Sequence, residues 1–235
     1  EAIASKVGHE LHKQKDHPLN AVKLKIEDFC QEYAKKKYFK SSTSQFAIFD
    51  SLKPLVTPKA CFDDLLVKPD HVSRSMSDTY YVSDELVLRT HTSAHQTELI
   101  ASNNDLFLCS GDCFRRDEID SSHYPVFHQM EGVKIFDQAE LVNGDEIIEK
   151  DLKELLTGLA THLFGNVEMR WSSDYFPFTN PSFELEVNFE GEWLEVLGCG
   201  VIEPDVLANA GKKGSKGWAF GLGLERLAMI LYKIP

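Results

Sequence analysis

The sequence predicts one α+β domain over residues 1–235, in which an antiparallel β-sheet is flanked by helices. Long stretches have apolar residues at helical spacing, and other stretches alternate apolar and polar residues in pairs separated by turns. Strands and helices do not alternate regularly, as they would in a parallel doubly wound sheet. A chain of 235 residues that is 43% hydrophobic can bury one sizeable core.

The helices are predicted from apolar residues spaced three and four apart. The first runs from Leu19 to Phe39, where the apolar stripe comprises Val22, Ile26, Phe29 and Tyr33. A second is expected over Glu146–Phe164, ended by Gly165, and should pack flat against the sheet. A third follows the glycine-rich stretch 217–223, because leucines recur there at helical spacing.

The strands are predicted from alternation with period two. Between residues 183 and 190, apolar side chains alternate with glutamate and asparagine, and Gly191 permits a turn into Trp193–Leu197. These segments should form an antiparallel hairpin. Leu106–Arg115 and Val126–Phe136 are expected to form a second pair of strands, joined by the polar stretch 116–125.

Composition narrows the classes of function. No apolar run approaches the roughly 20 residues of a membrane-spanning helix, so we expect a soluble protein without membrane partners. The formal net charge of −12 would repel a polyanion, and composition alone does not suggest nucleic acid. The five cysteines are an odd number without repeated spacing, which favours a reducing compartment over a disulfide framework.

Three segments resemble known binding motifs but lack a residue or spacing that the motif requires. Gly221–Arg226 begins like a dinucleotide-binding fingerprint, but Arg226 stands where a third glycine allows close packing. Gly211–Lys216 has the wrong glycine spacing for a phosphate loop and is interpreted as a surface loop. His91 and His95 are spaced like zinc ligands of metalloproteases, yet threonine replaces the glutamate that should follow the first histidine.

Polar and aromatic side chains converge on one face of the second predicted strand pair. Side chains two apart on a strand share a face, so Arg115 and Asp117 point together, as do Phe127, Gln129 and Glu131. Arg115 with Asp117 alone would more often be an ion pair across the sheet. The whole set is costly in a core and suits a ligand site.

The motifs resemble those of class II aminoacyl-tRNA synthetases. Phe114–Asp117 is similar to their motif 2 and Gly221–Arg226 to their motif 3; each match is weak alone, and the two together are strong. Further phrases resemble phenylalanyl-tRNA synthetases of the organellar, single-chain kind: Arg89–Ser93, Val126–Gly132, Tyr175–Phe178, Gly217–Gly221, Asp120–Pro125 and Trp193–Gly200. Motif 2 here ends in Asp117, where many relatives have glutamate.

The resemblance implies a ligase that forms a carbon–oxygen bond. Its expected partners are phenylalanine, ATP and tRNA(Phe), with Mg²⁺ beside ATP, in the mitochondrial matrix or a plastid, or otherwise in the cytoplasm. We expect a monomer whose residues 1–235 form the catalytic domain, without the C-terminal anticodon-binding domain of organellar relatives. The alternative is a non-catalytic paralogue that binds tRNA or an amino acid.

The resemblance also implies the residues that bind ATP. Arg115 would grip the α-phosphate and the substrate carboxylate through its planar guanidinium, and Arg226 would hold the far phosphate and cover the adenine. Phe127 would stack on the other face of the adenine. Glu195 would contact Mg²⁺ or the nucleotide; the alternative, that it is an exposed strand glutamate without a binding role, fits the sequence nearly as well. The remaining implied contacts to ATP are Asp117, Ser122, His123, Tyr124 and Glu131.

The implied phenylalanine site has a polar end and an aromatic end. His91, Ser93, Gln96, Gln129 and Glu131 would surround the ammonium and carboxylate groups. Phe176 and Phe178 would meet the substrate ring edge to face, although phenylalanine pairs on strands are more often core residues. Ala219, Phe220 and Gly221 would form the wall of the pocket, where a small residue at position 219 leaves room for the phenyl ring.

Overall fold

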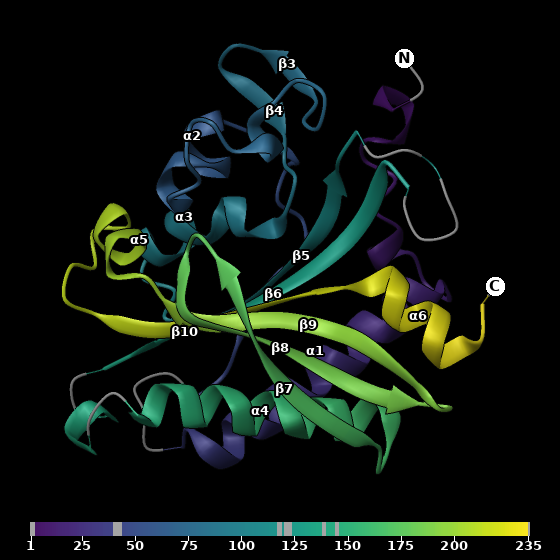
Figure 1. Ribbon diagram of the computed structural model, residues 1–235, viewed down its shortest axis with the longest axis vertical. Helices are drawn as coiled ribbons and strands as arrows, with labels where there is room; N and C mark the ends of the chain where they lie inside the picture. The colour runs from purple at the N-terminus through teal and green to yellow at the C-terminus, as the bar shows by residue number, and fades with distance from the viewer. Residues whose placement is uncertain are drawn as a thin grey trace.

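The computed structural model describes residues 3–39, 44–116, 119, 124–137, 140–143 and 146–234 (Figure 1). Three expected ATP contacts, Asp117, Ser122 and His123, lie outside these residues. In the part of the chain that is described, no helix is long and apolar enough to cross a membrane. All five cysteines are buried and free.

A seven-stranded sheet forms the centre of the molecule, in the order β1-β5-β6-β10-β9-β8-β7. Its strands are β1 (Ala47–Phe49), β5 (Leu106–Phe114), β6 (Val126–Phe136), β7 (Glu168–Phe176), β8 (Thr179–Phe189), β9 (Glu192–Ile202) and β10 (Lys216–Gly223). All neighbouring strands are antiparallel except β1, which pairs in parallel with β5 at the edge. The predicted α+β class with an antiparallel sheet is confirmed.

Both predicted strand pairs form. β5 and β6 pair in register from Leu106 opposite Lys134 to Phe114 opposite Val126. β8 and β9 form the hairpin with its turn at Gly191, whose φ of +92° is a conformation that glycine adopts easily. The glycine-rich stretch before the last helix, for which no strand was predicted, is the strand β10 and lies between β6 and β9.

The three predicted helices are α1 (Pro18–Lys37), α4 (Glu146–Phe164) and α6 (Leu224–Tyr232). α1 begins where the ring of His17 accepts the backbone N–H of Leu19 and Pro18 occupies the first turn. α4 packs on β9 and β10, and α1 contacts both α4 and α6. In Figure 1, α1 and α4 lie below the sheet and cover its lower face. Buried apolar residues of these helices and strands form one large core.

A smaller lobe covers the other side of the sheet and was not predicted (Figure 1). It contains the short strands β2 (Leu55–Val56), β3 (Tyr81–Ser83) and β4 (Leu86–Leu88), paired in the order β2-β4-β3. The remaining helices are α2 (Pro58–Cys61), α3 (Gln96–Ala101), α5 (Pro204–Asn209), η1 (Ala4–Lys6), η2 (Leu11–Lys13), η3 (Asp63–Leu65), η4 (Val72–Arg74), η5 (Thr92–His95) and η6 (Glu140–Asn143). A second apolar cluster joins this lobe to the sheet.

Candidate active site

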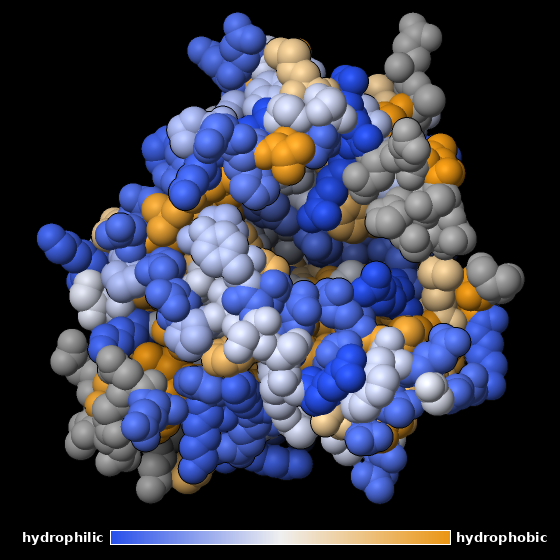
Figure 2. Space-filling view, viewed as in Figure 1, coloured by the Kyte–Doolittle hydropathy of each residue, from blue (hydrophilic) through white to orange (hydrophobic). Residues whose placement is uncertain are grey.

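A cavity of about 540 Å³ opens between the small lobe and the sheet. Figure 2 shows this face hollowed below the lobe, with mostly hydrophilic residues around the opening. Strands β6, β9 and β10 form its floor, η5 and the segment 67–73 line it from the lobe, and the turn from β7 to β8 lines it from a third side. Residues separated by more than 150 positions in the chain therefore meet at one site.

The wall that carries η5 is anchored by a buried arginine. Arg89 is 1% exposed and bonds both the carbonyl of Asp112, at 2.7 Å, and its carboxylate, at 2.8 Å. A Cβ on Gly111 would overlap this guanidinium, so glycine at that position lets the arginine reach β5. Because both bonds are buried and one of them joins opposite charges, Arg89 ties the segment that leads into η5 to β5.

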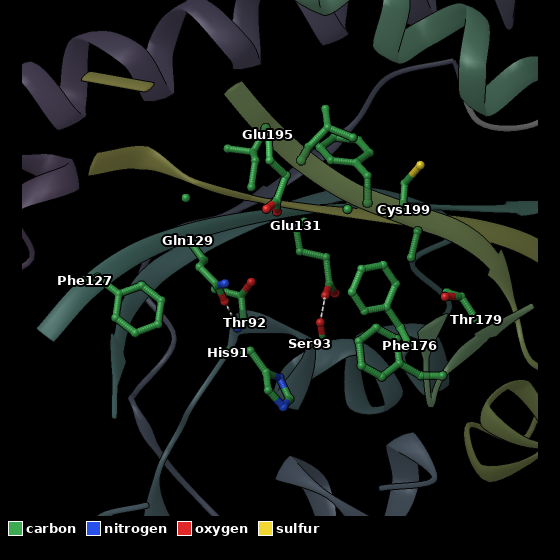
Figure 3. A pocket seen from close by; sticks show the side chains of 18 of the residues that line it. His91, Thr92, Ser93, Phe127, Gln129, Glu131, Phe176, Thr179, Glu195 and Cys199 are labelled. Carbon is green, nitrogen blue, oxygen red and sulfur yellow. Dashed lines mark hydrogen bonds between the residues drawn. The ribbon is translucent and has the colours of Figure 1, made fainter. Parts of the chain in front are cut away.

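The predicted shared face of β6 is confirmed. Phe127, Gln129 and Glu131 all line the cavity, whereas His128 between them does not. The amide oxygen of Gln129 accepts the backbone N–H of Thr92 at 3.3 Å (Figure 3). This bond ties the floor of the cavity to the wall formed by η5.

Glu131 is a nearly inaccessible carboxylate at the centre of the site. It is 2% exposed, one oxygen accepts the hydroxyl of Ser93 (Figure 3), and the other oxygen has no partner among the described groups. Burial raises the pKa of Glu131 to about 7, although the Ser93 hydrogen bond opposes this shift. A cation placed beside the unpaired oxygen would restore the ionised form, so the site suits an ammonium group.

Two aromatic rings form the far side of the cavity. Phe176 ends β7 and Phe178 lies in the turn before β8, and the ring centroids are 6.1 Å apart at an angle of 18°. The pair was expected on one face of a strand; the turn brings both rings to the cavity instead. In Figure 3, Phe176 and Phe127 lie on opposite sides of Gln129 and Glu131.

Arg115 borders the other half of the cavity. Its Nε donates to the carbonyl of Thr90 at 3.0 Å, and its guanidinium lies over the ring of Phe127, 5.0 Å from the centroid. Nε of Arg115 is thus bonded to the backbone, and the residue lines the cavity, where its two terminal nitrogens have no hydrogen-bond partner among the described residues and can meet a ligand. This arrangement can bind an anionic oxygen beside an aromatic face.

Arg226, in the first turn of α6, faces β9 across the cavity mouth. Its Nη1 donates to the carbonyl of Glu195 at 3.1 Å and lies 3.6 Å from the Glu195 carboxylate. Both side chains are about half exposed, at 56% and 49%, and both line the cavity. Several carboxylates lie near Glu195. Burial and the Glu195 charge raise the pKa of one of them, Glu184, to about 7.

The two histidines have separate environments that do not fit zinc. His91 lines the cavity, and burial together with the Arg115 cation lowers its pKa to about 3, so it is neutral near pH 7. Nε2 of His95 lies 2.8 Å from the guanidinium of Arg89, and its Nδ1 is 2.6 Å from Glu98. Among the described residues, no group of three or more His, Cys, Asp or Glu side chains could hold a metal ion.

Most of the expected site residues lie together in this cavity. Those lining it are His91, Ser93, Arg115, Tyr124, Phe127, Gln129, Glu131, Phe176, Phe178, Glu195, Ala219, Phe220, Gly221 and Arg226. Gln96 differs, because it is 1% exposed and does not line the cavity; it lies beside Glu131, whose pKa it lowers, in opposition to burial. From this position Gln96 would act behind the cavity wall.

Sequence reasoning missed several lining residues. Val67, His71 and Ser73 come from the small lobe, which carries no periodic pattern. Thr179, Gly198 and Cys199 also line the cavity. They lie on β8 and β9, parts of which were predicted as strands, but their residue types gave no chemical signal. Glu225 also lines the cavity; its place directly before Arg226 was a signal that could have been used.

Comparison with known proteins places this geometry in a family. The model of the tRNA synthetases class II core domain (F) matches residues 4–235. The chain is 54% identical, over all of its length, to "Phenylalanine–tRNA ligase, chloroplastic/mitochondrial" of Arabidopsis thaliana, and covers 54% of that protein. It is 48% identical, over 99% of its length, to "Phenylalanine–tRNA ligase, mitochondrial" of Rattus norvegicus, of which it covers 55%.

A solved structure shows the same fold. The crystal structure of pyrrolysyl-tRNA synthetase from Desulfitobacterium hafniense aligns with a TM-score of 0.63 and 15% identity, covering 89% of this chain and 69% of that one. At that identity the likeness concerns the fold alone. The chain spans about half the length of the curated relatives it matches, 54% and 55% of the two described above.

Proposed function

The chain belongs to the class II tRNA synthetases of the phenylalanine type, and from this premise we propose that it is a phenylalanine–tRNA ligase. It would activate phenylalanine with ATP to form phenylalanyl-adenylate and transfer the phenylalanyl group to the 3′ end of tRNA(Phe). The names of the relatives support a mitochondrial or plastid location for this activity.

One observation carries the proposal: the cavity is divided into halves that suit the two small substrates. The half with Ser93 and Glu131 offers an acceptor for an ammonium group, next to the apolar rings of Phe176 and Phe178. The half with Arg115, Phe127 and Arg226 offers two cations and an aromatic face. An aromatic amino acid and a nucleoside triphosphate are the pair of ligands that this division favours.

In the first step, the phenylalanine carboxylate would attack the α-phosphorus of ATP and pyrophosphate would leave. Arg115 lies over Phe127 in the second half, where its guanidinium would hold the carboxylate and the α-phosphate and stabilise the charge that develops between them. Arg226 would hold the leaving pyrophosphate. In the second step, the terminal adenosine hydroxyl of tRNA would attack the adenylate carbonyl, the bond from that carbonyl to the phosphate would break, and AMP would leave. A phosphate oxygen or water would accept the proton of the hydroxyl.

Mg²⁺ would accompany ATP, and the residues present fit this ion. Magnesium is commonly held by one or two carboxylates while substrate phosphates and water supply the remaining oxygens. Glu195 lines the cavity and Glu184 lies near enough for the two negative charges to interact. The bound ion would neutralise charge on the phosphates.

The amino-acid specificity would come from the apolar half of the cavity. Ala219 is 4% exposed on β10 and its small side chain leaves space for the phenyl ring beside Phe176 and Phe178. A pocket of this kind rejects an added hydroxyl only moderately, unless that hydroxyl is blocked or left without a partner. Tyrosine is therefore the informative competitor.

Phenylalanine-dependent exchange of pyrophosphate into ATP tests the proposal. The wild-type protein should exchange with phenylalanine, more weakly with tyrosine, and the Arg226→Ala variant should lose the exchange while keeping its fold. Absence of exchange in folded wild-type protein with Mg²⁺ present would reject the activity and favour a non-catalytic paralogue. Transfer is then measured separately with tRNA(Phe).

A further inference from the structure

The first turn of α6 is held to the sheet by an unusual contact. Glu225 places one carboxylate oxygen 2.8 Å from the backbone nitrogen of His128, which donates to it, and the other 2.7 Å from Nδ1 of the same residue. Gly223, the residue before the helix, provides no side-chain cap. The Glu225 carboxylate is therefore the group that ties the start of the helix to β6.

His128 is a firm anchor for this carboxylate. Its side chain is 3% exposed and points away from the cavity, between two neighbours that line it. The ring of His12 packs 5.3 Å from its ring, and Asp112 is its direct partner on β5. Because the imidazole is enclosed, its Nδ1–H is presented to Glu225 in one direction.

The contact lies at the point where β10 turns into α6. Gly223 is the last residue of β10 to pair with β6, opposite Gln129, and Arg226 follows only three residues later. On its other side, the polar partner of Arg226 among the described residues is the half-exposed Glu195. A rotation of this first helical turn would move the Arg226 guanidinium relative to the cavity floor.

We propose that Glu225 is a positioning residue for ATP: by bridging the backbone and ring of His128, it sets the place of Arg226 relative to the adenine-facing ring of Phe127. The role rests on the proposed function, in which Arg226 contacts ATP. Since Phe127 directly precedes His128 on β6, the same contact joins the two side chains expected on opposite faces of the adenine. Phenylalanine, which would lie against β7 and β10, does not depend on it.

The central test is a double-mutant cycle on the affinity for Mg–ATP, measured by calorimetry without phenylalanine. Glu225→Ala should weaken ATP binding about tenfold, because a displaced Arg226 loses part of its charge-assisted contact with the phosphates. In an Arg226→Ala background, the same change should have almost no further effect, because Glu225 acts through Arg226. Equal weakening in both backgrounds would overturn the proposal.

Conservative variants distinguish a role in placing Arg226 from a role in stabilising the fold. His128→Asn retains an N–H donor close to the place of Nδ1 and should keep ATP affinity within about threefold, whereas His128→Gln moves the donor and should behave like Glu225→Ala. Glu225→Gln keeps one acceptor oxygen for one of the two N–H groups and should be intermediate. If all four variants lower the melting temperature but leave ATP affinity unchanged, the contact is only structural and the proposal fails.

Kinetics provide an independent readout. In pyrophosphate exchange, Glu225→Ala should raise KM for ATP about tenfold and change KM for phenylalanine less than about twofold. Glu192→Ala, at an exposed position on β9 outside the cavity, is the control and should change neither. Wild-type protein without exchange would reject the proposed function alone, because the calorimetric cycle still decides the role of Glu225. Equal increases in the KM values for ATP and for phenylalanine in Glu225→Ala would contradict the proposed role of Glu225.

Discussion

Glu131 shows how a single residue can serve binding at the expense of stability. It is buried without a positive partner, and burial raises its pKa to about 7 from an ordinary value of 4.5. Between these two pH values the unfolded chain has lost the proton that the folded protein keeps. The free energy of unfolding therefore falls as pH rises from about 4.5 to about 7, and the penalty is constant above that range.

Glu131→Gln should stabilise the protein at pH 8 by about 1–3 kcal/mol and remove this part of the pH dependence. The amide has almost the same shape and carries no charge to be desolvated. Urea unfolding of wild type and variant at pH 5 and pH 8 measures the difference. The same variant should bind phenylalanine more weakly, because the ammonium group loses its carboxylate.

The control for Glu131→Gln is Glu192→Gln, the same chemical change at an exposed side chain outside the cavity. It should leave the pH dependence of unfolding near that of wild type. If the Glu131→Gln protein retains the wild-type slope between pH 5 and pH 8, the carboxylate does not carry a raised pKa and this account of the site is wrong.

At the scale of elements, β9 approaches the turn between β7 and β8 closely enough to require glycine. A Cβ on Gly198 would lie 2.6 Å from Cζ of Phe176. Glycine on this strand therefore permits the aromatic ring to occupy the cavity wall. The packing of one strand thus decides where a side chain of another element stands.

Gly198→Ala should displace the Phe176 ring and weaken phenylalanine binding by about 1–3 kcal/mol, the usual cost of overpacking. Calorimetry with phenylalanine gives the change, and ATP affinity is the internal reference. In a Phe176→Leu background, the alanine should cost less, because the smaller side chain vacates the space. Equal costs in both backgrounds would show that the strand itself is disturbed.

Helix α4 also carries a buried carboxylate that is hydrogen-bonded to two other segments of the core. Asp151 accepts the hydroxyl of Tyr38 from the segment after α1, at 2.7 Å, and the indole N–H of Trp218 from β10, at 2.8 Å. Burial raises the pKa of Asp151, which its two donors only partly offset. The residue links two layers of the molecule at a point next to Ala219.

Asp151→Ala should reduce the free energy of unfolding by about 2–4 kcal/mol, because two buried donors lose their acceptor. Glu154→Ala on the same helix is the matched control; its ion pair with Lys37 is 40–47% exposed and should be worth less than about 1 kcal/mol. Urea midpoints measure both. Similar losses in the two variants would contradict the role assigned to Asp151.

At the scale of the whole molecule, the acidic balance limits interaction with RNA. A formal net charge of −12 gives no long-range attraction for a polyanion, whatever the local contacts at the cavity mouth. Small substrates that enter the cavity depend instead on the local cations Arg115 and Arg226. Neither step of the proposed reaction should therefore depend strongly on salt.

We expect tRNA to bind this chain weakly, with an affinity that loses less than about tenfold between about 50 and 200 mM salt because few phosphates are neutralised. Pyrophosphate exchange should change little over the same range. Fluorescence anisotropy with labelled tRNA(Phe) gives the salt slope. A steep fall of tRNA affinity with salt would contradict this prediction and would indicate a basic tRNA-binding surface despite the negative net charge.

The sequence by itself determined the main layers and most of the chemistry. Apolar periodicity located α1 and the full extent of α4, and runs of strand-forming residues bounded by turns located β5, β6, β8 and β9. The motifs around Arg115 and Arg226 identified residues that the fold does place in one cavity. Both kinds of signal are local, and neighbouring residues are enough to carry them.

Only the tertiary structure decided how these parts meet. The short strands β2 to β4 have too few residues for a periodic pattern, and β10 is made largely of glycines and apolar residues that predict no strand. Contacts across long separations, such as Glu225 with His128 or Asp151 with Trp218, leave no mark in the local sequence. The withdrawal of Gln96 behind the cavity wall likewise follows from packing, because burial depends on which distant elements cover a side chain.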